Sequence, residues 1–165
     1  MYGMPIKPKI YLDTSVISHL MADDSPDKRD DTRKLWEQIK HSGFEVVLSP
    51  VVYEELGRCE PALEKALLEY VVMIDTTYIE ENEKMTALAD EYLKTGVLKE
   101  KSYNDCRHIA IASVSACKYI LSWNMKHFVK RRTIEMVQSV NQRLGIFQPS
   151  IITPAIFVEG DDDNE

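Results

Sequence analysis

The stretch KIYLDTS, residues Lys9–Ser15, decides the predicted fold. Its short apolar run ends on the carboxylate of Asp13, and two hydroxyl side chains follow. A buried parallel strand has such a continuous apolar run, and its carboxyl end lies at the edge of the sheet where open α/β folds place ligands. The stretch therefore predicts a buried strand that carries Asp13 to that edge. We expect further carboxylates to join it there and to hold a divalent metal ion.

Length and composition favour one globular domain. The chain has 165 residues, of which 44% are hydrophobic and 28% are charged, so it is long enough to bury a core. We predict a single domain over residues 1–158 and a disordered acidic tail over residues 159–165. No apolar run is long enough to cross a bilayer, and residues 1–8 lack the apolar region of a secretory signal, so we expect no association with a membrane.

The three cysteines, Cys59, Cys106 and Cys117, are odd in number and have no CxxC spacing. This pattern indicates neither a disulfide framework nor a zinc site. Free thiols in a reducing compartment explain it most simply, and we therefore predict a cytoplasmic protein.

The distribution of charge is more informative than the net charge of −7. The segment from Asn104 to Arg143 contains seven Lys or Arg residues and two acids, which gives it a charge of +5 and leaves −12 for the remainder. A basic segment on an acidic protein is compatible with a polyanionic substrate. A solvated helix face explains the same segment equally well.

Extended and helical patterns alternate along the chain. Further strands are predicted at residues 44–48, 71–74, 119–122 and 151–152, and a buried helix is predicted at residues 105–116 with Asn104 as its N-cap. Strands that alternate with helices form mainly parallel sheets with helices on both faces. The predicted fold class is therefore α/β, a three-layer α/β/α sandwich.

Four polar residues follow directly from these core elements at the carboxyl edge of the predicted sheet: Asp13, Glu55 or its neighbour Glu54, Asp105 and Asn124. Carboxylates brought together raise one another's pKa unless a cation neutralises them, and Mg²⁺ binds such oxygen ligands. Each residue also has a structural explanation. Asp13 alone is a good helix cap, Asp105 favours a helix dipole, the glutamates suit a solvated helix, and Asn124 suits a turn.

Other chemistries lack their motifs. The sequence contains no GxxxxGK[ST], GxGxxG or GxSxG pattern, and the four histidines do not form HExxH. His108 lies one helical turn after Asp105, and we expect it to be packed or hydrogen-bonded rather than a metal ligand.

Four segments together resemble the PIN domain family, and within it the stand-alone ribonucleases of the VapC type. They read YLDTSVI at residues 11–17, LSPVVYEEL at 48–56, NDCRHIA at 104–110 and SWNMKHF at 122–128. They stand in the order of the family, and the resemblance covers about residues 9–128. It implies a PIN-like α/β/α sandwich and an endoribonuclease that depends on Mg²⁺ or Mn²⁺. An antitoxin protein is a partner that the resemblance suggests, and a homodimer is usual for the family.

Carried over by position, the resemblance implies that Asp13, Glu55 and Asp105 are the catalytic, metal-binding acids. Glu55 is preferred to Glu54 because the acid of the family usually precedes Leu or Ile directly. Ser15 would lie beside the metal and contact the substrate. Asn124 stands where many PIN domains have a fourth acid, so it would join the metal site without adding charge.

The basic residues that follow, Lys126, Lys130 and Arg131 or Arg132, are expected to hold the RNA. The favoured function is a metal-dependent endoribonuclease, as the toxin of a toxin–antitoxin pair. One alternative is a PIN-like module that binds RNA or protein with weak or no nuclease activity, which Asn124 and the overall acidity favour. Another is a nuclease that cleaves DNA, because the metal chemistry does not distinguish ribose from deoxyribose.

Overall fold

A computed structural model describes residues 7–162 of the chain, and its centre is a sheet of five parallel strands. The order across the sheet is β3-β2-β1-β4-β5, so the strand that ends at Asp13 lies in the middle. In register, Tyr11 pairs with Val47 on one side and with Ile120 on the other. The strands are β1 (Lys9–Leu12), β2 (Glu45–Leu48), β3 (Thr76–Tyr78), β4 (Tyr119–Leu121) and β5 (Ser150–Ile152).

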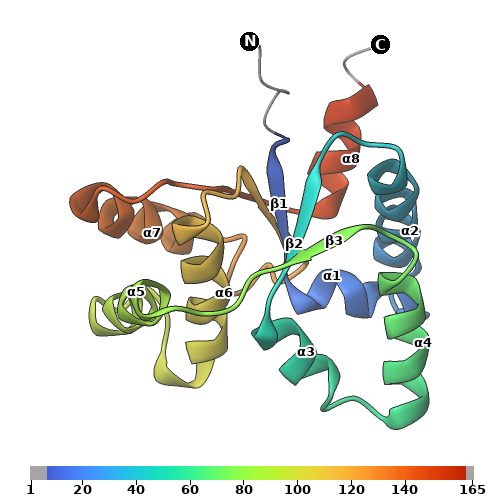
Figure 1. Cartoon of the computed structure of the whole chain (residues 1–165), viewed down its shortest axis with the longest axis horizontal. Coiled ribbons are helices and arrows are strands. Elements are labelled where there is room, and N and C mark those ends of the chain that lie inside the picture. The colour runs from blue at the N-terminus through green and yellow to red at the C-terminus, as the bar shows by residue number, and fades with distance from the viewer. Residues whose placement is uncertain (1–6, 163–165) are drawn as a thin grey trace.

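Helices cover both faces of this sheet. Figure 1 shows α5, α6 and α7 on one side and α1, α2, α4 and α8 on the other, with α3 below the carboxyl ends of the strands. The predicted three-layer α/β/α sandwich is confirmed. The helices are α1 (Thr14–Ser18), α2 (Pro26–Lys40), α3 (Pro50–Leu56), α4 (Pro61–Val71), α5 (Glu83–Lys94), α6 (Tyr103–Val114), α7 (Arg131–Leu144) and α8 (Pro154–Asp162), with two short 3-10 helices at His19–Met21 and Glu100–Ser102.

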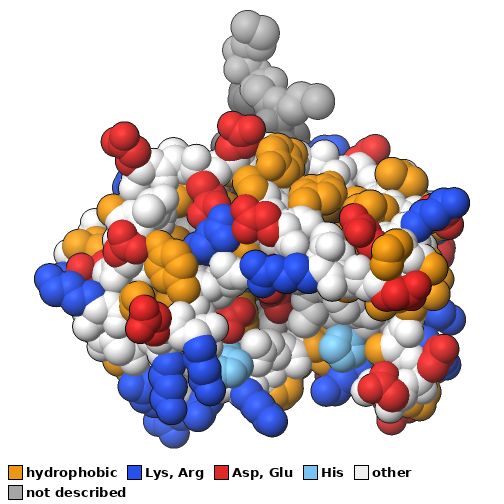
Figure 2. Space-filling model, turned by 90° about the horizontal axis from the view of Figure 1, so that it is seen from below, with side chains coloured by type: hydrophobic (Ala, Val, Ile, Leu, Met, Phe, Trp, Pro, Cys, Tyr) orange, Lys and Arg blue, Asp and Glu red, His pale blue; other side chains and the backbone are white. Residues whose placement is uncertain are grey.

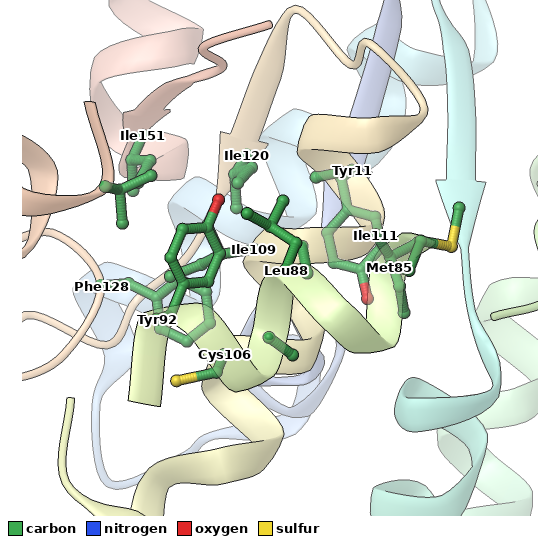
Figure 3. Close-up of a cluster of buried hydrophobic side chains, with 14 of the residues drawn as sticks. Tyr11, Met85, Leu88, Tyr92, Cys106, Ile109, Ile111, Ile120, Phe128 and Ile151 are labelled. Atoms are coloured by element: carbon green, nitrogen blue, oxygen red, sulfur yellow. The ribbon is translucent and has the colours of Figure 1, made fainter. Parts of the chain in front are cut away.

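The strands supply side chains to two separate cores because successive residues of a strand point to opposite faces. Tyr11, Val47 and Ile120 join the core under α5, α6 and α7, which is drawn in Figure 3. Ile10 and Leu12 join the core under α1, α2 and α8. Both cores anchor β1, so the position of Asp13 at its end is set by packing on each side.

The third strand differs from its prediction. Residues 71–74 were expected to form it, but Val71 is the last residue of α4, and β3 begins only at Thr76. Within the apolar run, Val71 and Ile74 are buried, whereas Val72 and Met73 are exposed in the turn that follows α4. β3 pairs only with β2, at the edge of the sheet, and two of its three residues are exposed, so it lacks the apolar pattern of the central strands.

The C-terminal segment also differs from expectation. Helix α8 runs through Asp162, so the first four residues of the tail that was predicted to be disordered are helical. Phe157 and Val158 are buried against the α2 side of the sheet, and they anchor this helix. The rest of the predicted tail, residues 163–165, lies outside the described residues. Within the described part of the chain, the helices are too short or too polar to cross a membrane.

Candidate metal centre

Three acidic residues reach the carboxyl edge of the sheet from three different elements. Asp13 directly follows β1, Glu55 lies in the last turn of α3, which follows β2, and Asp105 lies in the first turn of α6. Asp13 is buried, with 4% of its surface exposed, and the other two are half-buried. The sequence prediction that these elements deliver their acids to one edge therefore agrees with the arrangement of the fold.

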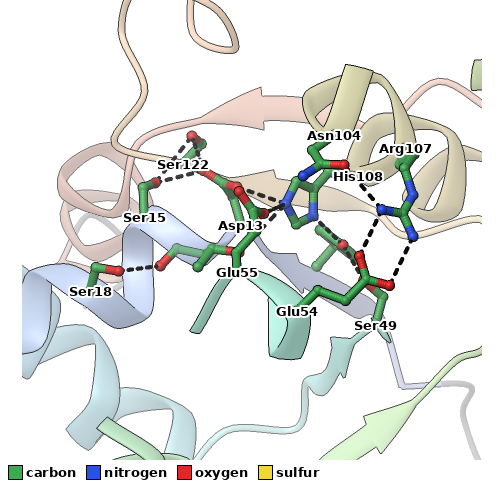
Figure 4. A network of polar contacts seen from close by, with 12 residues as sticks. Asp13, Ser15, Ser18, Ser49, Glu54, Glu55, Asn104, Arg107, His108 and Ser122 are labelled. Carbon is green, nitrogen blue, oxygen red and sulfur yellow. Dashed lines mark hydrogen bonds and ion pairs between the residues drawn. The ribbon is translucent and has the colours of Figure 1, made fainter. Parts of the chain in front are cut away.

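The carboxylate of Asp13 is held in a defined orientation. The hydroxyls of Ser15 and Ser122 donate to Oδ2 at 2.6 and 2.8 Å (Figure 4). The other oxygen, Oδ1, lies 3.4 Å from Nε2 of His108. Asp13 occupies the N-cap position of α1, but its side chain makes no capping hydrogen bond. The alternative explanation of Asp13 as a helix cap is therefore wrong.

Ser15, which was expected to contact the substrate, forms hydrogen bonds within the protein. Its hydroxyl donates to Asp13 and accepts a hydrogen bond from the backbone N–H of Trp123 at 3.0 Å. These contacts make Ser15 a residue that positions Asp13. Its contact with a substrate stays a prediction.

Glu55 and Asp13 both lie close to Nε2 of His108. Oε1 of Glu55 accepts from the hydroxyl of Thr14 at 2.9 Å and lies 2.5 Å from Nε2 of His108. Burial raises the pKa of Glu55, but the hydrogen bond and charge of His108 and the hydrogen bond from Thr14 outweigh it, so the pKa is lowered. An ionised carboxylate can only accept, and Nε2 of His108 therefore carries a proton.

His108 is fully buried and links the centre to the core. Its Nδ1 lies 2.5 Å from the hydroxyl of Tyr11, which in turn lies 2.7 Å from the hydroxyl of Ser49. Burial lowers the pKa of His108, but the hydrogen bond to Glu55 and the nearby carboxylates raise it above its ordinary value. These contacts confirm the expectation that His108 is hydrogen-bonded within the fold.

The choice between Glu54 and Glu55 is explained by Arg107. The guanidinium of Arg107 donates to Oε2 of Glu54 at 2.8 Å, and it also pairs with Glu81 on the loop before α5. Glu54 thus turns to an ion pair while Glu55 turns to Asp13, as Figure 4 shows. Asn104 accepts from the same guanidinium at 3.0 Å. Its predicted role as N-cap is wrong, because the helix begins earlier and Ser102 is the cap residue.

Asp105 lacks the stabilising contacts of the other two acids. It forms no hydrogen bond or ion pair within the described residues. Burial, followed by the negative charge of Asp13, raises its pKa to about 7. The charge of Glu55 adds to the rise, and that of His108 opposes it. A half-buried carboxylate without a donor, close to two others, is an electrostatic arrangement that a cation stabilises.

The donor set fits a divalent cation. Asp13, Glu55 and His108 each offer a ligand atom, and these atoms all lie within 4.8 Å of one another. Carboxylate oxygens suit hard ions such as Mg²⁺ and Mn²⁺. Because His108 donates to Glu55, the oxygens of Asp13 and Glu55 are the most suitable ligands in this group for such an ion. Asp105 is not a member of the group, and its role as a metal ligand stays a prediction.

Asn124 is occupied in a turn. Its Oδ1 accepts from the backbone N–H of His127 at 3.0 Å, and its own carbonyl accepts from the N–H groups of Phe128 and Val129. The alternative explanation of Asn124 as a turn residue thus has direct support. Its role in metal binding stays a prediction, and it adds no charge to the centre.

The predicted substrate-binding residues divide into two groups. Lys126, Lys130 and Arg132 line a cavity of about 720 Å³, which we call the basic cavity. Arg131 does not line it, and its Nε donates to Glu135 at 2.8 Å. Lys99 and Lys101 also line the cavity, but they lie before the basic segment and were missed. Their only signal in the sequence was their position immediately before the helix of Asp105.

Comparison with known proteins identifies the family and the fold of the chain. No curated protein matches the chain by sequence. Among solved structures, a chain of the crystal structure of VapBC2 from Rickettsia felis, bound to a DNA fragment from their promoter, is similar with a TM-score of 0.52 at 12% identity. The match covers 88% of the present chain and 98% of the other, and it shows a shared fold. The family model of the PIN domain matches residues 10–124, well over half of the sequence. The chain therefore belongs to the PIN domain family.

Proposed function

We propose that this protein is an endoribonuclease that depends on Mg²⁺ or Mn²⁺. The observation that carries the proposal is the convergence of Asp13, Glu55 and Asp105, from three separate core elements, at one edge of the sheet. Burial, and after it the negative charge of Asp13, raises the pKa of Asp105, so an ionised Asp105 destabilises the metal-free protein. Burying several carboxylates together costs free energy of folding, and a bound cation would offset that cost. Membership of the PIN family agrees with this interpretation.

The residues of the chain have separate tasks in this proposal. A divalent cation, when bound, supplies the positive charge that stabilises a phosphodiester under attack and that activates water. Ser15 and Ser122 hold Asp13, while Thr14 and His108 hold Glu55, so both carboxylates are oriented before any ligand arrives. Asp105 completes the set of negative charges. Lys126 and Lys130 in the basic cavity attract the phosphates of the RNA.

The decisive test compares matched RNA and DNA strands as substrates in the presence of Mn²⁺. We expect wild-type protein to cleave the RNA internally and Asp13→Asn protein to lose this cleavage. EDTA should abolish cleavage by the wild type. If purified Asp13→Asn protein cleaves RNA as the wild type does, the assignment of the centre is wrong, and preferential cleavage of the DNA strand would overturn the assignment of the substrate.

A second candidate is a PIN-like module that binds RNA or protein without efficient cleavage. The observation that favours it is Asn124, which adds no carboxylate and uses its side-chain oxygen in a turn. A titration with Mn²⁺ followed by a cleavage assay separates the two functions. Binding of metal and RNA without turnover would support the module.

A more specific form of the proposal is a toxin neutralised by an antitoxin. It is supported by the similarity in fold to a chain of the VapBC2 structure. We place this toxin in the cytoplasm, as the cysteine pattern of the sequence predicts. Arrest of growth on expression, relieved by the protein of a neighbouring reading frame, would support this form. If no such protein relieves the growth arrest, the antitoxin proposal is wrong and the nuclease proposal remains.

We also propose a homodimer, which is usual for the family. Val16, Ile17 and Leu20 on the first helices are fully buried in the core and are not available to a partner. Val72 and Met73, at the end of α4, are exposed apolar side chains. Sedimentation of the wild type and of Val72→Asp protein would test this surface, because only a dimer that uses it dissociates on the substitution.

A further inference from the structure

The basic cavity carries an excess of positive charge that the protein does not neutralise. Five of its lining residues are Lys or Arg, and Glu100 is the one acid among them. Within the described part of the chain, none of the four lysines forms an ion pair. Figure 2 shows Lys and Arg side chains gathered beside a histidine on the face where the strands end. On a chain with a net charge of −7, this concentration of cations favours an anionic ligand.

One wall of the cavity is a preformed turn at the end of α5. The N–H of Gly96 donates to the carbonyl of Leu93 at 3.1 Å, and the N–H of Val97 donates to that of Tyr92 at 2.9 Å. Gly96 has a φ of 78°, in the left-handed region that this type of helix end requires. Val97 is fully buried. The wall is therefore rigid before a ligand binds.

Arg132 connects this wall to the opposite side of the cavity. Its guanidinium donates to the carbonyls of Val97 and Gly96 at 3.2 and 3.0 Å. Neutral carbonyls accept these hydrogen bonds without cancelling the charge. One cation of the cavity is thus fixed in place, whereas Lys126 and Lys130 are exposed on flexible side chains that can adapt to a ligand.

The cavity is larger than an inorganic anion requires, and it is not polar throughout. Its volume of about 720 Å³ lies within the range of pockets that enclose small organic ligands, roughly 300–1,000 Å³. Leu93, Val97 and Leu98 contribute apolar surface beside the cations. A ligand that combines a flat apolar group with a phosphate matches both parts, and a nucleotide has this composition.

The walls of the cavity are also the immediate neighbours of the metal centre along the chain. Lys101 lies four residues before Asp105, and Lys126 lies four residues after Ser122, which holds Asp13. We propose that the basic cavity binds one unpaired nucleotide of the RNA, base and phosphate together, next to the bond that the metal centre cleaves. This inference rests on the proposed function. It also specifies the substrate as single-stranded, because a base within a duplex is paired and stacked and cannot enter a cavity without the cost of extrusion.

The first test needs neither metal nor cleavage. Nucleoside monophosphates, inorganic phosphate and uncharged nucleosides are titrated separately into the full chain in EDTA, and binding is followed by NMR at the amides of Val97 and Leu98. We expect the monophosphates to shift these signals at lower concentration than phosphate or nucleosides do. Equal binding of inorganic phosphate and monophosphates, or no shift at these amides, would overturn the proposal.

The second test uses two adjacent residues with the same charge. Lys130→Ala removes a cation that lines the cavity, whereas Arg131→Ala removes one that does not. Both side chains are exposed, so neither substitution should disturb the fold. In an Asp13→Asn background that prevents cleavage, we expect Lys126→Ala with Lys130→Ala to weaken binding of unpaired RNA tenfold or more. The slope of log affinity against log salt should fall by about 0.7 for each phosphate contact that is lost on a single strand.

The two tests separate this inference from the function on which it rests. If Lys130→Ala and Arg131→Ala weaken RNA binding equally, the cavity proposal is wrong even where the wild type cleaves RNA. If monophosphates bind at the cavity and the wild type cleaves no RNA, the nuclease proposal fails and the nucleotide site stands.

Discussion

The metal centre and the basic cavity have residues close to one another along the chain, and they are built in opposite ways. Asp13 and Glu55 follow core elements and are held by buried hydroxyls and by His108, so their positions are set before a ligand arrives. The cavity is formed by helix ends and a turn, and its lysines extend into solvent without partners in the described chain. The centre therefore offers fixed geometry, and the cavity offers charge that adapts.

This difference has an energetic cause. Buried carboxylates are costly unless each oxygen has a donor or a cation, so the centre needs a network around it. Exposed lysines remain hydrated and need no such network. Substitutions in the centre should therefore change both chemistry and stability, whereas substitutions in the cavity should change binding alone. The following predictions test this separation, from the largest expected effect to the smallest.

The strongest test compares two consecutive glutamates. Glu55→Gln should lower the rate of RNA cleavage on the order of 10³-fold, because a charge oriented toward the reacting centre is lost. Glu54→Gln makes the same chemical change in an ion pair with Arg107 and should alter the rate only a few-fold. The measurement is cleavage of one RNA at saturating Mn²⁺. Equal losses in the two variants would show that both glutamates, or neither, belong to the centre.

The second prediction concerns pH and the metal-free protein. The pKa of Asp105 is raised from 3.8 to about 7, so the folded state binds this proton more tightly than the unfolded state does. The contribution of Asp105 to the free energy of unfolding therefore falls as pH rises from about 4 to about 7. Asp105→Asn should be more stable than the wild type at about pH 8 in EDTA, by up to about 4 kcal/mol, and equally stable near pH 4.

Denaturant unfolding at both pH values measures this difference. Because Asp105 would bind the cation, Mn²⁺ should stabilise the wild type more than it stabilises Asp105→Asn. A variant that is less stable than the wild type at about pH 8 in EDTA would contradict the proposed cost of burying an ionised Asp105 beside Asp13.

A third prediction tests the connection between the centre and the core. Tyr11→Phe removes the hydroxyl that links Ser49 to His108 and leaves two buried polar groups short of a partner. We expect a loss of about 1–3 kcal/mol in the free energy of unfolding. Tyr92→Phe, in the same core, removes a hydroxyl that bonds to Asn141 and Ser113, away from the centre. It should also lower stability but leave the affinity for Mn²⁺ unchanged, unlike Tyr11→Phe.

The smallest effect is expected in the cavity. Lys130→Ala should change the free energy of unfolding by no more than about 0.5 kcal/mol, because its side chain is exposed. Its affinity for Mn²⁺ in the absence of RNA should equal that of the wild type, as measured by calorimetry. Weaker metal binding in this variant would mean that the centre and the cavity are not separate.

The sequence by itself determined the fold class and the edge at which the acids meet. Local patterns are sufficient for this. The apolar run that ends in Asp13 can be recognised from residues that are close in the chain, and so can the alternation of strands and helices. The same patterns misplaced the third strand, since β3 lies at the edge of the sheet and is largely exposed. They also gave no sign of α8, which continues to Asp162 and packs against α2, an element far away in the sequence.

Only the tertiary structure decided how the side chains of the centre are used. Glu54 and Glu55 are equivalent in local pattern, and Arg107, 53 residues from Glu54, separates their roles. His108 reaches Glu55 over the same separation in sequence, and Lys99 joins Lys130 in one cavity across two intervening helical segments and a strand. Such pairings depend on how complete elements pack against one another. A pattern that spans a few residues carries no information about that packing.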